Sequence, residues 1–329
     1  MNEAKTAFVT GGTGFLGINL IRALCDQNWS ITALHRATSD LTYIKDLPIK
    51  LAEGSITEKA TLCDAIPTNA SVVFHLAGDT NLWSKKNAQQ TEVNVTGTQN
   101  LIDAAIDKGA KKFIHTSSIS AWGSARGNVT EETPQCGGQS WINYEKSKFL
   151  GEQVALENAN RGIDVTIINP GSIVGAFDKS SWAQMFFAIR NGELPGVPPG
   201  TNSFVHVNDV VQALIIASEK GKPGERYLVT GTDSTLQELA AHMAKVMGLA
   251  KVPKKLPKWL LMTVARLGMI SSAFTGKEPT ITPEKVELLS RKGFGYSNDK
   301  ALAQFNYTST PWQQGVQESY DWLIREGLL

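Results

Sequence analysis

Tyr144 and Lys148 form the side-chain pair with the clearest capacity for chemistry, four residues apart near the start of a predicted helix. Residues at this spacing lie on one face of a helix, so a phenol and an ammonium can act together. The positive charge is expected to lower the pKa of the phenol from its usual value of about 10, which makes it a proton donor or acceptor near neutral pH. Tyr296 and Lys300 repeat the spacing, but nothing else around them suggests a site.

Ser118 gives the first pair its setting. It lies 26 residues before Tyr144 and follows the apolar run Phe113-Ile114, where a buried strand reaches the carboxyl end of a sheet. A hydroxyl at this point can hydrogen-bond a substrate oxygen and hold it beside the phenol. We therefore expect Ser118, Tyr144 and Lys148 to form a catalytic trio that transfers a proton at a substrate oxygen.

The glycine-rich stretch 10–17 (TGGTGFLG) indicates what binds beside this trio. It follows a short apolar run and precedes apolar residues at helical spacing, which predicts strand, tight turn and helix. The glycines fit the G-x-G-x-x-G register from Gly12 and a looser register from Gly11. Missing side chains let the backbone approach a pyrophosphate, whose charge then lies against the N-terminal N–H groups of the helix. The stretch predicts a dinucleotide cradle.

The end of the second predicted strand bears on the type of dinucleotide. An acidic residue that binds the ribose of NAD is expected about 20 residues after the glycines, but the chain has His35 and Arg36 there. A guanidinium can pair with a 2′-phosphate through two hydrogen bonds. We predict NADP(H), with NAD(H) less favoured and kept open by the nearby Asp40.

Composition narrows the class of protein. The 329 residues are 42% hydrophobic and 19% charged, and the formal net charge is +1, without a block of Lys or Arg that would predict binding to nucleic acid or to an anionic membrane. The three cysteines, Cys25, Cys63 and Cys136, are scattered, and the first predicted strand leaves no room for a cleavable leader. We expect a cytoplasmic protein. The apolar stretch 259–270 is too short to span a membrane; it could pack on the core, cover a ligand or lie on a membrane surface.

Strand and helix patterns alternate over the first part of the chain. Predicted strands at 31–34, 49–52, 71–76, 112–116 and 164–168 are separated by predicted helices at 57–66, 87–108 and 141–160. This order predicts an α/β fold, a Rossmann-type doubly wound parallel sheet. We expect a dinucleotide-binding domain at 1–170 and a smaller, mostly helical substrate lobe at 171–329, with a strand return to the main sheet left open.

Together these motifs resemble the extended short-chain dehydrogenase/reductase family. The resemblance covers nearly the whole chain and includes 10–17, Phe74-His75-Leu76-Ala77-Gly78, Asn94-Val95-Thr96-Gly97-Thr98, Thr116-Ser117-Ser118, Tyr144-x-x-x-Lys148, Asn169-Pro170-Gly171 and 204–210. It implies that Ser118, rather than Ser117, is the catalytic serine. One departure is Gly54-Ser55, where many relatives have Gly-Asp contacting adenine.

The resemblance also implies the contacts of the cofactor and substrate. Lys148 is expected on the nicotinamide ribose, and Asn94 in a structural role or a proton relay. The full set of expected cofactor contacts is Gly11, Thr13, Gly14, Phe15, Leu16, Gly17, His35, Arg36, Ser55, Ile56, Leu76, Ala77, Gly78, Asn94, Thr116, Tyr144, Lys148, Pro170 and Ser172. Expected substrate contacts are Thr80, Trp83, Ser118, Trp122, Trp141, Gly171 and Trp182, of which only some of the aromatic residues are expected to touch ligand.

Within the family, the sequence looks similar to dihydroflavonol reductases and hydroxysteroid dehydrogenases, on 34–36, 190–195 and 221–227. This likeness implies reduction of a ketone or aldehyde on a bulky, largely apolar small molecule, with a homodimer left open. Two alternatives remain: a nucleotide-sugar epimerase or dehydratase that retains NAD, with Arg190, Arg226, Arg266 or Arg291 on the diphosphate, and a cofactor-sensing protein without turnover. The five histidines lack zinc-ligand spacing, and there is no G-x-S-x-G motif for a serine hydrolase.

Overall fold

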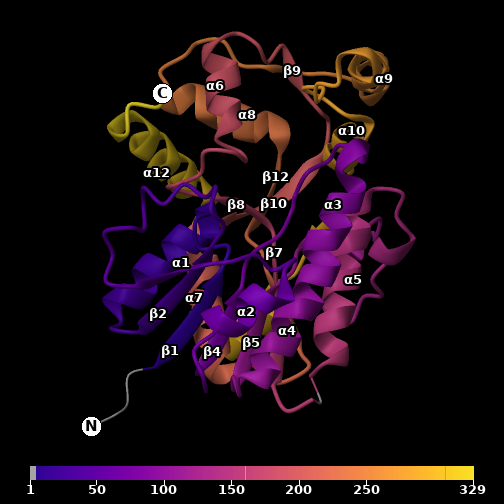
Figure 1. Cartoon of the computed structure of the whole chain (residues 1–329). Coiled ribbons are helices and arrows are strands. Elements are labelled where there is room, and N and C mark those ends of the chain that lie inside the picture. The colour runs from indigo at the N-terminus through magenta and orange to yellow at the C-terminus, as the bar shows by residue number, and fades with distance from the viewer. Residues whose placement is uncertain (1–4, 160, 308) are drawn as a thin grey trace.

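A computed structural model describes residues 5–159, 161–307 and 309–329 of the chain (Figure 1). Its main sheet has seven parallel strands in the order β11-β7-β5-β4-β1-β2-β3. These are β1 (Thr6–Thr10), β2 (Ser30–His35), β3 (Lys50–Glu53), β4 (Val72–His75), β5 (Lys112–Thr116), β7 (Asp164–Pro170) and β11 (Arg226–Val229). The doubly wound α/β sheet expected from the sequence is confirmed.

Helices cover both faces of this sheet, so its strands are apolar on both sides. In β1, Ala7 and Val9 belong to the core beneath the helices of one face, while Phe8 belongs to the core of the other, and all three are fully buried. The first face carries α1 (Phe15–Asp26), α7 (Val207–Lys220) and α11 (Asp299–Phe305). The second carries α2 (Lys59–Ala65), α4 (Gly97–Asp107) and α5 (Asn143–Glu157).

The single helix expected over 87–108 is divided into three parts. It runs as α3 (Asn87–Thr91), a π-helical segment (Glu92–Thr96) and α4. A π segment holds one extra residue per turn and is frequent at functional sites. Here it contains Asn94, whose side chain is buried and turned toward the loop after β4.

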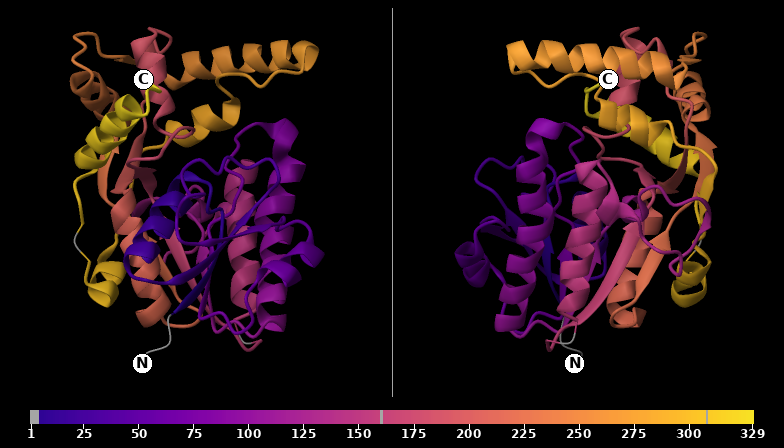
Figure 2. Two further views of the ribbon diagram at one scale, coloured as in Figure 1. Left: turned by 60° about the vertical axis from the view of Figure 1, so that its left-hand side comes forward. Right: turned by 90° about the vertical axis from the view of Figure 1, so that its right-hand side faces the viewer.

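The second lobe lies over the carboxyl edge of the sheet (Figures 1 and 2). A three-stranded sheet of β8 (Ser172–Val174), β10 (Thr201–His206) and β12 (Thr232–Thr235) forms its base. Its helices are α6 (Gln184–Arg190), α8 (Leu236–Val246), α9 (Lys258–Thr275), α10 (Pro283–Leu289) and α12 (Trp312–Arg325). Two short parallel pairs complete it, β13 (Lys254–Lys255) with β9 (Gly196–Val197), and β14 (Phe294–Tyr296) with β6 (Gly127–Val129).

The lobe is discontinuous in sequence, so a single boundary at residue 170 does not separate the two parts. After β10 the chain returns to the main sheet as α7 and β11, and α11 packs against both later on. The carboxyl half therefore supplies one edge strand and two helices of the dinucleotide-binding sheet. The mostly helical pattern expected for this half missed the three-stranded sheet, because its strands are three to six residues long.

Candidate active site

The glycine turn between β1 and α1 is built for close approach of a ligand. A Cβ at Gly11, where φ is +71°, would lie 2.6 Å from the backbone nitrogen of Ala77, and one at Gly17 would lie 2.1 Å from the carbonyl oxygen of Gly11. Gly14 is exposed, caps α1 without a side chain, and no acidic residue follows in the first turn. The N-terminal N–H groups of α1 therefore present a positive end toward the carboxyl edge of the sheet, as a pyrophosphate requires.

The expected cofactor residues lie along the carboxyl ends of neighbouring strands. Thr13, Phe15 and Leu16 surround the turn and are partly buried; Leu76, Ala77 and Gly78 leave β4 beside it, where the Leu76 N–H donates to the Thr10 oxygen at 3.2 Å. Two buried hydroxyls at the end of β5, on Thr116 and Ser117, have no hydrogen-bond partner among the described residues. An edge with a glycine cradle and unpaired hydroxyls fits a dinucleotide.

The residues after β2 bear on the choice between NADP and NAD that the sequence left open. The Arg36 side chain is exposed, and the Arg36 backbone N–H donates to the Ser39 hydroxyl at 3.0 Å. The Asp40 carboxylate instead pairs with Lys179 at 2.8 Å and accepts the Thr42 N–H at 3.0 Å, and these contacts hold its pKa well below its usual range. Asp40 is thus committed to a surface ion pair.

Residues after β3 are largely occupied by contacts within the protein. The Ser55 hydroxyl hydrogen-bonds the Thr57 hydroxyl at 2.8 Å, and the Ser55 N–H donates to Thr61. Ile56 is buried and packs so tightly on Gly97 that a Cβ there would lie 2.7 Å from its Cδ1. Ile56 is thus mainly a core residue that fixes α4, and the adenine contact of Ser55 stays a prediction.

Asn94 supports the loop that follows β4. Its side-chain oxygen accepts the Asp79 N–H at 2.7 Å, and its amide donates to the Asp79 oxygen and to the Ser147 hydroxyl, each at 2.9 Å. The side chain is 4% exposed, so it does not lie on a solvated helix face. Asn94 therefore connects the loop at Gly78 to α5, which carries Tyr144 and Lys148.

Ser118, Tyr144 and Lys148 meet at the carboxyl edge of the sheet. Ser118 follows β5 in extended conformation, with its oxygen accepting the Ser120 N–H at 3.1 Å. The hydroxyls of both serines face the Tyr144 phenol closely enough to lower its pKa. Lys148 lies one turn after Tyr144 in α5, and its Nζ donates to the Thr116 carbonyl at 2.9 Å. The structure thus brings together the residues selected from spacing and adds Ser120, two residues beyond Ser118, which sequence reasoning missed.

The electrostatics of the phenol differ from the expectation. The pKa of Tyr144 is raised, because burial outweighs the two serine hydroxyls and the adjacent Glu145 carboxylate adds to the increase. Lys148 is turned toward Thr116 and Gly78, and it is not among the groups that shift the phenol. Burial lowers the pKa of Lys148 itself to about 8. The phenol is therefore protonated at neutral pH.

Two buried carboxylates on α5 hold the helix that carries the trio. Glu145 and Glu152, seven residues apart and both fully buried, bind Arg291 and Arg226 from the second half of the chain. Arg291 also donates to the Gly123 oxygen at 2.7 Å, and the Ser140 hydroxyl donates to Glu145 at 2.5 Å. These ion pairs were not predicted from the sequence. The available signal was the spacing of the two glutamates, seven residues apart on one helix.

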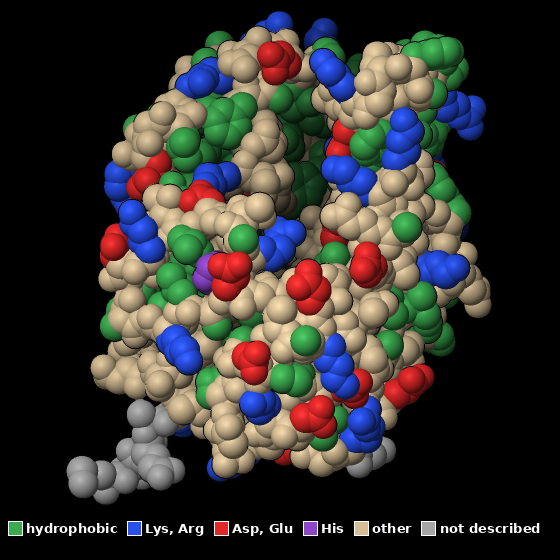
Figure 3. All heavy atoms as spheres, viewed as in Figure 1, with side chains coloured by type: hydrophobic (Ala, Val, Ile, Leu, Met, Phe, Trp, Pro, Cys, Tyr) green, Lys and Arg blue, Asp and Glu red, His purple; other side chains and the backbone are tan. Residues whose placement is uncertain are grey.

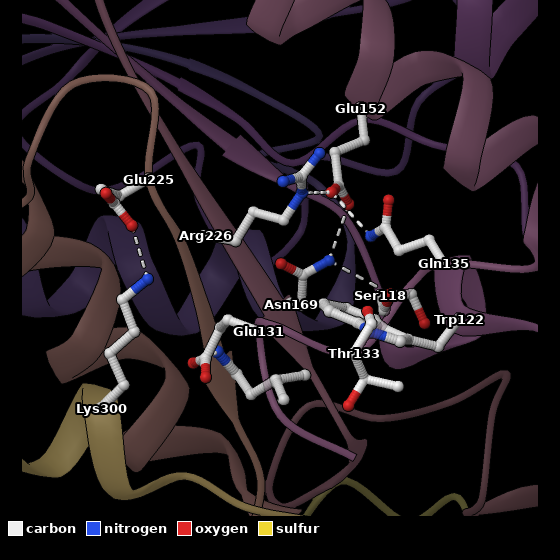
Figure 4. Close-up of polar contacts among 11 residues, drawn as sticks. Ser118, Trp122, Glu131, Thr133, Gln135, Glu152, Asn169, Glu225, Arg226 and Lys300 are labelled. Atoms are coloured by element: carbon white, nitrogen blue, oxygen red, sulfur yellow. Dashed lines mark hydrogen bonds and ion pairs between the residues drawn. The ribbon is translucent and has the colours of Figure 1, made fainter. Parts of the chain in front are cut away.

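The second of these pairs extends to Ser118 (Figure 4). The Asn169 amide, in β7, donates to Glu152 at 2.8 Å and to the Ser118 carbonyl at 3.2 Å, and Gln135 donates to Glu152 at 2.8 Å. These bonds use the Asn169 amide nitrogen, while its side-chain oxygen has no partner among the described residues. A buried hydrogen-bond network of this kind restricts the geometry of the groups it joins. Arg226 in β11 and Glu152 in α5 thus position the backbone of the serine through Asn169.

The expected substrate contacts have different outcomes. Trp122 is fully buried, donates to the Thr133 oxygen at 2.8 Å and packs with Val129 and Leu228, so its expected contact with substrate is wrong. Trp83 is nearly buried beside Lys85 and Lys86, whereas Trp141 is 59% exposed. The remaining three lie in the lobe or at its junction with the sheet: Trp182 against Phe204, Gly171 against Ser203, and Thr80 exposed after β4.

Two histidines, which the sequence predicts to be hydrogen-bonded strand-end residues rather than zinc ligands, differ in their contacts. His75 is paired on both ring nitrogens, with Thr10 at 2.9 Å and Thr98 at 3.0 Å, and burial lowers its pKa to about 3. His115, expected to be satisfied in the same way, has no partner on either ring nitrogen among the described residues, and burial holds its pKa well below its usual range. Tyr296 lies in β14 and Lys300 in α11, where Lys300 is bound to Glu225 at 2.6 Å.

The glycine cradle, the strand order and the trio at the carboxyl edge define a dinucleotide-binding protein of the Rossmann type. The family model "NAD dependent epimerase/dehydratase family" matches residues 7–230, and the chain belongs to this family. Within it, the extended short-chain dehydrogenase/reductase pattern read from the sequence is confirmed.

Full-length relatives include sterol and ketone enzymes. The chain is 28% identical over 329 residues to "Sterol demethylase protein B" of Methylococcus capsulatus, covering 98% of this chain and 100% of the relative. It is 27% identical over 317 residues to "4-hydroxy-2-methyl-3-oxo-4-farnesyl-3,4-dihydroquinoline-1-oxide ketoreductase" of Stigmatella aurantiaca, covering 94% of each. Among solved structures it is similar to "gox2253", at a TM-score of 0.85 and 30% identity with 99% of each chain covered.

Proposed function

We propose that this protein is an NADP(H)-dependent reductase of a ketone or aldehyde on a bulky, largely apolar substrate. The observation that carries the proposal is the grouping at one edge of the sheet of a partly buried Tyr144 phenol, the Ser118 and Ser120 hydroxyls that face it, and Lys148. A general acid must hold its proton at working pH. A phenol that holds its proton at neutral pH can serve as this acid when a carbonyl is reduced.

Each residue of the site has its own role in this reaction. The Ser118 hydroxyl donates to the carbonyl oxygen and orients it, and the Tyr144 hydroxyl gives that oxygen its proton. The resulting phenolate is stabilised by the Ser118 and Ser120 hydroxyls and regains a proton from solvent. Lys148 Nζ, held by the Thr116 carbonyl, is placed to bind the nicotinamide ribose. A bound NADPH supplies the hydride for the carbonyl carbon.

Arg36 supports the choice of NADPH. It lies at the carboxyl end of β2, is exposed and has no acidic partner among the described residues. Asp40, the carboxylate that left NAD open in the sequence, is bound to Lys179. A guanidinium at this position attracts the additional phosphate of NADPH.

The second lobe supports an apolar substrate. Viewed as in Figure 1, the molecule is hollowed between α6 and α8 on one side and α9 and α10 on the other, and hydrophobic side chains lie in the depth of this hollow (Figure 3). The ketoreductase named above acts on a farnesylated ring, which is of the same chemical class. The sugar-nucleotide alternative requires cations for a diphosphate, but Arg226 and Arg291 are bound to buried glutamates.

Consumption of NADPH by the purified protein, against hydrophobic ketones, aldehydes and nucleotide sugars, tests this proposal. Tyr144→Phe should lower kcat/KM about 10²- to 10⁴-fold, the usual effect of losing a general acid. Tyr296→Phe is the matched control, since Tyr296 has the same Y-x-x-x-K spacing outside the site. Turnover of a nucleotide sugar with retained NAD and no NADPH consumption would favour the epimerase, and unchanged activity in Tyr144→Phe would contradict the role of the phenol.

A further inference from the structure

The outer face of α9 carries large apolar side chains that no described part of the chain covers. Trp259 is 70% exposed, Leu267 is 61% exposed, Ile270 is 58% exposed and Phe274 is 87% exposed. Their spacing of three to eight residues places them on one stripe along the 18-residue helix. Scattered exposed apolar residues are ordinary, but a continuous stripe marks an interaction surface.

This stripe is a second apolar face, distinct from the one by which α9 packs on the lobe. Leu261 and Ala265 are buried against Val286 of α10, and Ser272 is buried further along the same side. These residues lie on the opposite side of the helix from Leu267 and Phe274. Figure 2 shows α9 across the outer end of the lobe, extending past its body in both views. The helix therefore presents a long, accessible apolar surface.

The segment of chain that carries this surface has charges of one sign. Residues 251–277 contain six basic side chains and no acidic one: Lys251, Lys254, Lys255, Lys258, Arg266 and Lys277. Among these six, only Lys258 has an acidic partner in the described structure, Glu287 at 2.8 Å. The formal net charge of +1 averages over the chain and conceals this segment. The expectation of no anionic-membrane footprint rests on the charge of the whole chain, and segment 251–277 differs from that average.

We propose that α9 docks this protein onto an anionic lipid bilayer, with the helix parallel to the surface and the stripe inserted at the headgroup level. An interfacial helix combines an apolar face with flanking cations. A second copy of the chain fits less well, because a two-fold interface would bring two sets of six cations together. None of the described helices is long and apolar enough to cross a membrane, so contact would be peripheral. This inference goes beyond the proposed reductase activity and does not depend on it.

Docking through α9 would also orient the site. The Lys85 ammonium donates to the Ser272 carbonyl at 3.1 Å, and Lys86 pairs with Glu278, just after α9, at 3.0 Å. Both lysines adjoin Trp83, in the loop after β4. The end of α9 is thus tied to a loop at the carboxyl edge of the sheet, which would lie near the bilayer surface.

Co-sedimentation of the full chain with vesicles tests this proposal. The probes are vesicles of phosphatidylcholine alone and vesicles containing about a third phosphatidylglycerol. We expect binding to the anionic vesicles that weakens as salt is raised. Leu267→Ser with Phe274→Ser should weaken it about 100-fold or more, since each side chain contributes roughly tenfold. Lys254→Glu with Lys255→Glu should weaken it about 25-fold or more.

Matched variants elsewhere on the surface serve as controls. Ile324→Ser removes an apolar side chain that is 48% exposed on α12, and Lys45→Glu with Lys50→Glu reverses two exposed lysines on the sheet domain. Both should bind vesicles as the original chain does. Absence of binding to anionic vesicles, or equal losses in the α9 and control variants, would overturn the proposal. So would a dimer in sedimentation velocity that Leu267→Ser with Phe274→Ser dissociates, because the stripe would then be an interface between copies.

Discussion

Breaking the Arg226–Glu152 pair should cost several times more stability than breaking the Lys300–Glu225 pair beside it. The two pairs involve adjacent residues in the chain and appear together in Figure 4. Glu152 is fully buried, whereas the Glu225 and Lys300 side chains are 46% and 30% exposed. Arg226→Met and Lys300→Met remove one cation each and keep a similar length of side chain, so burial is the main difference between them.

The expected magnitudes follow from that difference. Removing one partner of a buried pair costs about 3–5 kcal/mol, because an uncompensated charge stays buried. Asn169 and Gln135 still donate to Glu152 and Arg226 is 26% exposed, so we expect roughly 2–3 kcal/mol for Arg226→Met. Lys300→Met should cost under about 1 kcal/mol, including the loss of its contact with the Tyr227 ring.

Thermal unfolding measures both. With an unfolding entropy of about 2.1 cal/mol/K per residue over 329 residues, these costs correspond to a fall in Tm of about 4 °C and about 1 °C. Glu152→Gln combined with Arg226→Met removes the uncompensated charge and should recover part of the larger loss. Arg226→Met should also lower kcat, since Glu152 and Asn169 hold the Ser118 carbonyl. Equal falls in Tm for the two single variants, or no recovery in the double variant, would refute the reasoning.

Three further predictions concern charge and proton binding. His115→Leu should be more acid-stable, because the buried imidazole stays neutral in the folded chain and becomes protonated near pH 6.5 in the unfolded chain. Between pH 7 and pH 5 the free energy of unfolding of the original chain should therefore fall by about 2 kcal/mol more than that of the variant, and equal falls in urea titrations would contradict this. Lys148→Met should raise the free energy of unfolding at pH 7 by up to about 3 kcal/mol while abolishing activity, because the pKa of Lys148 is about 8 in the folded chain and 10.5 ordinarily. The gain in stability should be full below pH 8 and disappear toward pH 10.5, and a gain that persists at pH 10.5 would contradict the prediction. Arg36→Ala should weaken kcat/KM for NADPH about 10- to 100-fold and leave NADH little changed, with Arg126→Ala as an exposed control; a parallel loss with both cofactors would remove Arg36 from the 2′-phosphate.

The sheet and the grouping of Ser118, Tyr144 and Lys148 could be predicted because both depend on local patterns. Continuous apolar runs such as 72–74 require a sheet covered on both faces. The glycines of 10–17 indicate a tight turn, and the turn lies so close to the Ala77 backbone that a side chain at Gly11 would not fit. Tyr144 and Lys148 share a face by helical geometry alone. Their proximity to Ser118 follows from parallel strands, since carboxyl ends meet at one edge.

The remaining features depend on contacts between residues far apart in the chain. Burial sets the pKa of Tyr144, and no spacing rule gives the depth of a phenol below the surface. Arg226 and Arg291 reach Glu152 and Glu145 across 74 and 146 residues, so their partners could not be read from the sequence. Trp122 illustrates the same limit, because its segment follows Ser118 while its ring is fully buried in a cluster with Val129 and Leu228.

The return of the chain to the main sheet as β11 constrains how this protein can be divided. A fragment ending at residue 170 would lack the strand that pairs with β7 and would leave an unprotected edge rich in Val and Ile, the kind of edge that promotes self-association. Chimeras that exchange specificity with a relative should therefore replace 171–206, 230–298 and 309–329 as three segments, because α12 packs on β10 and α8, and leave α7, β11 and α11 in the host. The second lobe is thus assembled from separate insertions in one sheet domain, and a cut in the middle of the gene would yield two pieces that each depend on the other.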